Sequence, residues 1–243
     1  MAKKSSSKPA TPAPKPTDNR ALERRVTLLI VVMIGLLAAF AWMGGSAGPA
    51  ALFLSDLGSA PADRLALSGR HIGVISGHRD FDSGAICDDG RTEVATIAPI
   101  AERVQQRLQR AGATVDVLGE YDPRLNGYMA DALISIHADS CIERSGFKVA
   151  RWADSAMPAV EDRLVTCLSD AYAATTGLIF DFNTVTNDMT QYHAFRRAAT
   201  QTPGAIIEVG YLGGDWSLIG EQPATAADGI VDGLVCFLQP QGP

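Results

Sequence analysis

The chain has 243 residues, 47% of them hydrophobic, which is enough for one core of ordinary size, and its net charge is −6. Residues 1–25 hold seven Lys or Arg and two acidic residues, so this segment carries +5 and the remainder of the chain carries −11. An acidic main part argues against nucleic acid as a partner.

The first segment, residues 1–25, is predicted to be a disordered basic tail. Positions 2–19 are mostly Lys, Ser, Pro, Ala and Thr, and they show no apolar period. Such a composition does not bury a hydrophobic core, so this part of the chain is not expected to fold by itself.

Residues 26–45 are predicted to be a transmembrane signal anchor. Every residue from Val26 to Trp42 except Thr27 is apolar or glycine, and the uncharged run of 20 residues is long enough to cross a bilayer as a helix. The cations precede this run, so we expect the tail in the cytoplasm. The rivals are a cleaved signal peptide, whose apolar region is usually only ~7–15 residues, and a buried core helix, which fits poorly with the charged flank. Both the anchor and the signal peptide place the rest of the chain outside the cytoplasm, and the anchor makes it a single-pass protein of the cell membrane.

Residues 46–69, rich in Gly, Ala, Ser and Pro, are predicted to be a linker, and residues 70–240 to be the folded domain. Strand and helix patterns alternate along this domain, which is typical of a single α/β domain with a mostly parallel central sheet covered by helices. The strand candidates are residues 72–76, 114–118, 132–137, 146–152 and 205–211. The helix candidates are residues 92–111, 159–176, 191–200 and 225–238.

Two histidines lie at the ends of predicted strands. His78 follows the first strand and His137 ends the third. In a parallel sheet the carboxyl ends of the strands lie along one edge, where ligands bind, so both rings should face the same crevice. Glu93 begins the helix after the first strand and starts at that same edge. Two imidazoles and one carboxylate suit zinc, with a fourth position left for water.

Two further residues are candidates for the chemistry at this edge. Glu208 lies in an otherwise apolar strand, where a charge is costly unless it is paired or coordinated. It is either a partner in a structural ion pair or a general base beside a metal-bound water. His193, just upstream of that strand, is either a surface helix residue or a residue that contacts the substrate.

The four cysteines permit disulfides outside the cytoplasm. Cys87 lies nine positions after His78 and Cys141 four after His137, so a bridge between them is plausible, and zinc binding by either is a lesser alternative. Cys167 and Cys236 lie in apolar helix patterns and are expected to be core residues.

The residue motifs carry a family resemblance. They are residues 76–85 (SGHRDFDSGA) followed by 89–93 (DGRTE), residues 135–139 (SIHAD), and residues 203–212 (PGAIIEVGYL). In order and spacing they resemble the zinc-dependent N-acetylmuramoyl-L-alanine amidases of the amidase-3 type, which trim peptidoglycan, and the resemblance covers roughly residues 70–238. Asp139 stands where this family usually has Asn, and Tyr211 where it usually has Phe.

The resemblance implies a role for each candidate. His78, Glu93 and His137 would be the zinc ligands and Glu208 the catalytic glutamate. The implied function is hydrolysis of the amide between N-acetylmuramic acid and L-alanine of peptidoglycan, for cell-wall remodelling. Two alternatives stay open, which are a zinc peptidase acting on another amide of the stem peptide and a non-catalytic peptidoglycan-binding module.

Overall fold

The computed structural model describes residues 66–239, in which one five-stranded sheet forms the centre. The strands are β1 (His71–Ser76), β2 (Thr114–Leu118), β3 (Ala132–Asp139), β4 (Lys148–Ala150) and β5 (Gly204–Tyr211). Their order across the sheet is β2-β1-β3-β5-β4, with parallel pairing throughout except for the antiparallel edge strand β4. The predicted α/β class with a mostly parallel sheet is confirmed.

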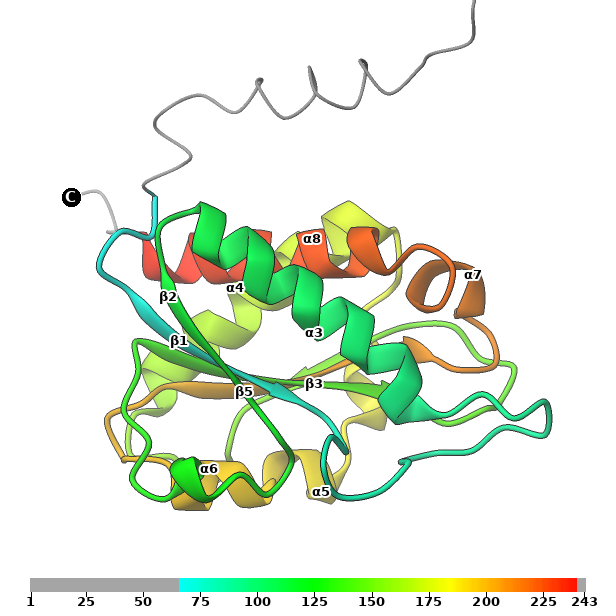
Figure 1. Cartoon of the computed structure of the whole chain (residues 1–243), viewed down its shortest axis with the longest axis horizontal. Helices are drawn as coiled ribbons and strands as arrows, with labels where there is room; N and C mark the ends of the chain where they lie inside the picture. The colour runs from blue at the N-terminus through cyan, green and yellow to red at the C-terminus, as the bar shows by residue number, and fades with distance from the viewer. Residues whose placement is uncertain (1–65, 240–243) are drawn as a thin grey trace, which may run out of the picture. The chain divides into compact units, whose positions relative to one another are not determined.

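Helices cover both faces of this sheet. Figure 1 shows three longer helices on one face, α3 (Glu93–Arg110), α4 (Pro158–Thr176) and α8 (Pro223–Leu238). On the other face lie two short helices, α5 (Asn187–Thr190) and α6 (His193–Arg197). Another short helix, α7 (Trp216–Ile219), and two 3₁₀ turns, η2 (Pro123–Leu125) and η3 (Phe182–Thr184), complete the described part.

The strands bury side chains on both faces because successive residues point to opposite sides. Val74 and Ile207 belong to a large core beneath α3, α4 and α8, whereas their neighbours Ile75 and Ile206 belong to a smaller core beneath α5 and α6. The continuous apolar sequence of β3 and β5 therefore reflects burial on both sides.

Helix α3 begins and ends where its sequence indicates. The Thr92 side chain accepts the Ala95 N–H as the N-cap, and Glu93 lies in the first turn, where a negative charge favours the helix. Gly112, just beyond the helix, has a positive φ of 96°. The buried stripe recurs at helical spacing along one face: Ile97, Ile100, Val104 and Leu108.

The helix expected over residues 191–200 is shorter in the structure, where only α6 (His193–Arg197) is helical. The Tyr192 backbone adopts an extended ψ of 132°, and α5 and α6 lie on either side of it. The reason is the tyrosine ring, which is buried and bonded to groups of the sheet edge, including the Ser135 hydroxyl.

All four cysteines form disulfides. Cys87–Cys141 has a Cα separation of 5.5 Å, and Cys167–Cys236 joins α4 to α8 with a Cα separation of 5.7 Å. Cys167 is buried in the larger core as expected, but the expectation that it and Cys236 are plain core residues was wrong in that the two are bridged. A Cβ at Gly233 would lie 2.7 Å from the backbone of α4, so glycine lets α8 approach closely enough for the bridge.

The N-terminal predictions lie outside the described residues. These are the basic tail (1–25), the signal anchor (26–45) and most of the linker (46–69). Leu67, at the end of that linker, packs in the larger core. Over residues 66–239, no helix combines the length and the apolar character needed to cross a bilayer.

Candidate metal centre

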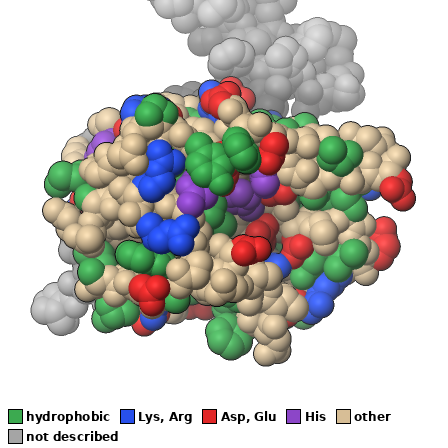
Figure 2. All heavy atoms as spheres, turned by 90° about the horizontal axis from the view of Figure 1, so that it is seen from below, with side chains coloured by type: hydrophobic (Ala, Val, Ile, Leu, Met, Phe, Trp, Pro, Cys, Tyr) green, Lys and Arg blue, Asp and Glu red, His purple; other side chains and the backbone are tan. Residues whose placement is uncertain are grey.

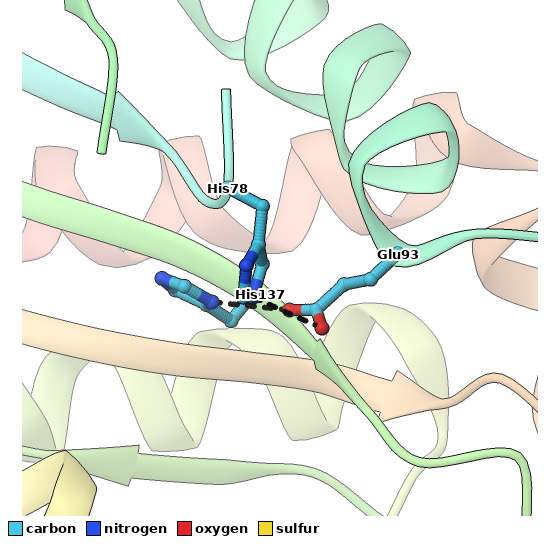
Figure 3. Close-up of side chains that lie close together, drawn as sticks. All are labelled: His78, Glu93 and His137. Atoms are coloured by element: carbon cyan, nitrogen blue, oxygen red, sulfur yellow. Dashed lines mark hydrogen bonds and ion pairs between the residues drawn. The ribbon is translucent and has the colours of Figure 1, made fainter. Parts of the chain in front are cut away.

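Three side chains from three elements converge at the carboxyl edge of the sheet (Figure 3). His78 follows β1, His137 lies in β3, and Glu93 is the first residue of α3. The His78 Nε2 lies 3.1 Å from the Glu93 Oε2, and the His137 Nδ1 lies 3.0 Å from the Glu93 Oε1. Each residue offers one ligand atom within 4.8 Å of the other two, so the structure brings together the three predicted ligands.

The second nitrogen of each histidine faces another carboxylate. The His78 Nδ1 lies 2.6 Å from the Asp82 Oδ1, and the His137 Nε2 lies 3.5 Å from the Glu120 Oε2. Metal-binding histidines commonly have their outer nitrogen held in this way, which fixes the tautomer and the ring orientation. The donor set and its outer contacts therefore fit a zinc ion.

Glycines make room for the two rings. A Cβ at Gly77 would lie 2.6 Å from the His137 Cε1, so the space beside this glycine holds the ring of the second histidine. His78 itself has a φ of 62°, in the region that favours glycine, and its N–H donates to the Glu120 Oε2 at 2.9 Å. The strained residue is thus held by a buried acceptor.

The electrostatics of the cluster favour positive charge. Burial tends to raise the pKa of Glu93, but hydrogen bonds to His137 and His78 outweigh it and bring the pKa to about 2. Burial tends to lower the pKa of His137, but the Glu120 and Glu93 carboxylates outweigh it and raise the pKa to about 10. The carboxylates that stabilise protons on these rings would also stabilise a metal cation bound in place of those protons.

Glu208 lies beside this cluster in β5. Its Cα pairs with His137 on one side and with Lys148 on the other. Its Oε2 is buried and has no hydrogen-bond partner, and the charges of His137 and Lys148 act on it without a direct hydrogen bond to that oxygen. Burial raises the pKa of Glu208 to about 7, which suits a general base near neutral pH.

His193, predicted to contact the substrate, is held from inside the protein. Its Nε2 lies 2.9 Å from the Glu120 Oε1, and its Nδ1 is buried without a partner. The ring stacks on Tyr121 with the centroids 4.2 Å apart. Substrate contact by His193 stays a prediction.

Sequence reasoning missed Asp82 and Glu120. Asp82 is four positions after His78 in a polar loop, and acids in such loops are usually solvated. Glu120 follows β2 at the same edge as the histidines, which is the signal that could have indicated it. Its side chain is only 7% exposed and contacts both histidines of the metal centre.

The centre is open to solvent on one side. The His78 side chain is 23% exposed and that of His137 8%. Figure 2 shows histidine side chains gathered on one face of the molecule, next to hydrophobic and acidic side chains. The Cys87–Cys141 disulfide joins the loop after His78 to the segment after His137. Because both cysteines are bridged, the alternative that either of them binds zinc was wrong.

A family model described as Amidase_3, N-acetylmuramoyl-L-alanine amidase, matches residues 72–215. The chain belongs to this amidase family. The matched range is more than half of the chain and contains the three predicted metal ligands and Glu208. No curated protein matches the chain.

Solved structures of amidases share the fold. The N-acetylmuramyl-L-alanine amidase Ami1 from Mycobacterium smegmatis is 20% identical with a TM-score of 0.59, covering 71% of this chain and 98% of that chain. The amidase AmiC2 of Nostoc punctiforme is 24% identical with a TM-score of 0.54, covering 70% and 98%. An amidase from Clostridium difficile 630 is 18% identical with a TM-score of 0.57, covering 71% and 98%.

Proposed function

We propose that this chain is a membrane-anchored, extracytoplasmic zinc hydrolase that cleaves the amide between N-acetylmuramic acid and L-alanine of peptidoglycan, in remodelling of the cell wall. Membership of the N-acetylmuramoyl-L-alanine amidase family supports the substrate and the reaction. The observation that carries the proposal is the convergence of His78, Glu93 and His137, with the Glu208 carboxylate beside them.

The three converging residues would hold the zinc ion. A set of three protein ligands is typical of catalytic zinc sites, which keep one position open. When bound, zinc supplies Lewis-acid activation of the water and of the amide carbonyl. Asp82 and Glu120 keep the two histidine rings turned toward Glu93, so the ligand atoms are set before any ion arrives.

Glu208 moves the protons. Burial raises the pKa of its carboxyl toward neutral pH, so Glu208 can both accept and release a proton. Its unpartnered Oε2 takes a proton from the attacking water. The same oxygen then gives that proton to the nitrogen of L-alanine as the amide bond breaks.

The N-terminal part of the chain supports the location. The cations before residue 26 and the apolar run of residues 26–45 favour an anchor with its C-terminal side outside the cytoplasm. The linker of residues 46–69 would then tether the domain close to the wall. Two disulfides in the described part fit an oxidising compartment.

The test is digestion of purified peptidoglycan with the full-length protein, followed by mass spectrometry of the products. We expect glycan strands that bear a free lactyl carboxylate and stem peptides that begin with L-alanine. Glu208→Gln should retain zinc and melt no lower than the wild type, because burial raises the pKa of the native carboxyl, while turnover falls by roughly 10²–10⁴-fold, the usual contribution of general base catalysis.

Glu161→Gln is a matched control. Glu161 in α4 is also a buried acid, but its Oε1 accepts the N–H of Gly204 at the opposite end of β5, 3.0 Å away. This variant should cleave at the wild-type rate. Fragments cut within the stem would identify a peptidase instead, and binding without cleavage by the zinc-loaded wild type would identify a binding module. If Glu208→Gln turned over at the wild-type rate, Glu208 would not be the general base.

A further inference from the structure

We propose that Glu120 is a positioning residue that fixes the metal ligand His137 and couples the metal centre to His193. The inference rests on the proposed metal centre. Glu120 follows β2, and its side chain is 7% exposed. A buried carboxylate is costly unless both of its oxygens are bonded, so the use made of each oxygen shows what the residue does.

One oxygen serves the metal centre. The Glu120 Oε2 accepts the N–H of His78 at 2.9 Å and lies 3.5 Å from the Nε2 of His137. It therefore touches the backbone of one proposed ligand and the side chain of the other. Since His137 turns its Nδ1 to Glu93, a proton on its Nε2 faces Glu120, which selects this tautomer.

The other oxygen bonds to the segment of α5 and α6, which lies on the sheet face opposite α3, α4 and α8. The Glu120 Oε1 accepts the Tyr192 hydroxyl at 2.8 Å and lies 2.9 Å from the His193 Nε2. Tyr192 separates α5 from α6, so this oxygen holds the break between the two short helices. One carboxylate thus joins β1, β3 and the α5–α6 segment at a single point.

The hydrogen bonding of His193 indicates that Glu120 sets the orientation of its ring. The His193 Nδ1 is buried without a hydrogen-bond partner, which is unfavourable for this ring on its own. The ring keeps this orientation because its Nε2 faces Glu120 and its plane stacks on Tyr121. Both oxygens of the Glu120 carboxylate are therefore bonded, while one nitrogen of the His193 ring is left without a partner.

The test measures metal binding by the full-length protein. Zinc affinity is obtained by competition with a chelator, and the ligand field is followed through the absorption spectrum after loading with cobalt. Glu120→Gln keeps the size of the side chain and removes its charge. We expect about 10–100-fold weaker zinc binding, as is usual when the outer partner of a ligand is lost, together with an altered cobalt spectrum. The matched control Glu161→Gln should change neither.

A second variant covers the case in which Glu120→Gln does not fold. His193→Phe removes one of the partners of the Glu120 Oε1 and keeps an aromatic ring against Tyr121. Coupling predicts a few-fold loss of zinc affinity in this variant. Wild-type affinity and an unchanged cobalt spectrum in folded Glu120→Gln, or in His193→Phe, would overturn the inference.

The outcome for the wild-type protein separates the two proposals. A wild-type chain that binds neither zinc nor cobalt would overturn the proposed function and this inference together. A wild-type chain that binds zinc and cleaves peptidoglycan, with Glu120→Gln binding the metal equally well, would overturn this inference alone.

Discussion

Replacement of both Cys87 and Cys141 by alanine should destabilise the protein and also weaken its metal centre. The bridge joins the loop between His78 and Glu93 to the segment just after His137, so it links the chain portions that carry the three proposed ligands. In its absence these portions are held only by hydrogen bonds and packing. We therefore expect two separate effects, one on the free energy of unfolding and one on zinc affinity.

The size of the first effect follows from the length of the closed loop. Cys87 and Cys141 are 54 positions apart, for which the chain-entropy model gives about 4 kcal/mol of stabilisation. For a domain of this size each kcal/mol corresponds to about 2–4 °C in melting temperature, so the loss should be about 8–16 °C. Reduction of the wild-type protein should produce a shift in the same direction.

The second disulfide provides the control. Cys167 and Cys236 are 69 positions apart, so the same model gives again about 4 kcal/mol for replacing both by alanine. This bridge joins α4 to α8, and neither helix contributes a proposed ligand. The two double variants should therefore lose similar stability, while only the Cys87–Cys141 pair loses zinc affinity.

The assay combines a thermal melt with chelator competition on the oxidised full-length proteins. If both double variants bind zinc as tightly as the wild type, the bridge near the centre does not position its ligands. If the Cys87–Cys141 variant melts at the wild-type temperature, the loop-closure reasoning itself is wrong for this chain.

Three further outcomes are expected. Gly84→Ala should weaken zinc binding far more than Gly90→Ala in the same competition assay. Both glycines have positive φ, but a Cβ at Gly84 would lie 2.6 Å from the Glu93 Oε2 and one at Gly90 would meet nothing within 4 Å, so equal affinities would contradict this account of the site. Burial raises the pKa of Glu161 above its value in the unfolded chain, so ionisation of this carboxyl destabilises the fold as pH rises. Glu161→Gln should therefore raise the melting temperature at neutral pH. A gain in melting temperature that does not shrink below about pH 4 would argue against this. A reporter fused after Pro243 should be active only outside the cytoplasm, and cytoplasmic activity would refute the predicted orientation of residues 26–45.

Much of the metal centre was predictable because it depends on local patterns and one general rule. Alternating strand and helix patterns indicated a parallel sheet, and parallel strands present their carboxyl ends at one edge. His78 and His137 follow or end such strands, and Glu93 begins a helix at that edge. Their convergence therefore needed no knowledge of detailed packing.

Other features depended on contacts between distant parts of the chain. The helix expected over residues 191–200 begins only at His193, because the Tyr192 hydroxyl donates to Glu120, 72 positions away. The Cys167–Cys236 bridge required α8 to lie close against α4, which depends on Gly233 meeting the backbone of the other helix. Helical spacing alone does not specify which helices become neighbours.

Glu120 shows most clearly what could not be predicted from the sequence. Its position after β2 places it at the same edge as the histidines, but an acid just after a strand is common and usually solvated, so this signal alone did not distinguish it. Its carboxylate becomes a shared acceptor only when β1, β3 and the α5–α6 segment meet around it. The sequence by itself determined the class of fold and the position of His78, Glu93 and His137 at the sheet edge, because those follow from periodicity within each element. Tertiary structure alone decided what surrounds the ligands, because burial and hydrogen bonding at Glu120 are set by the packing of segments far apart in the chain.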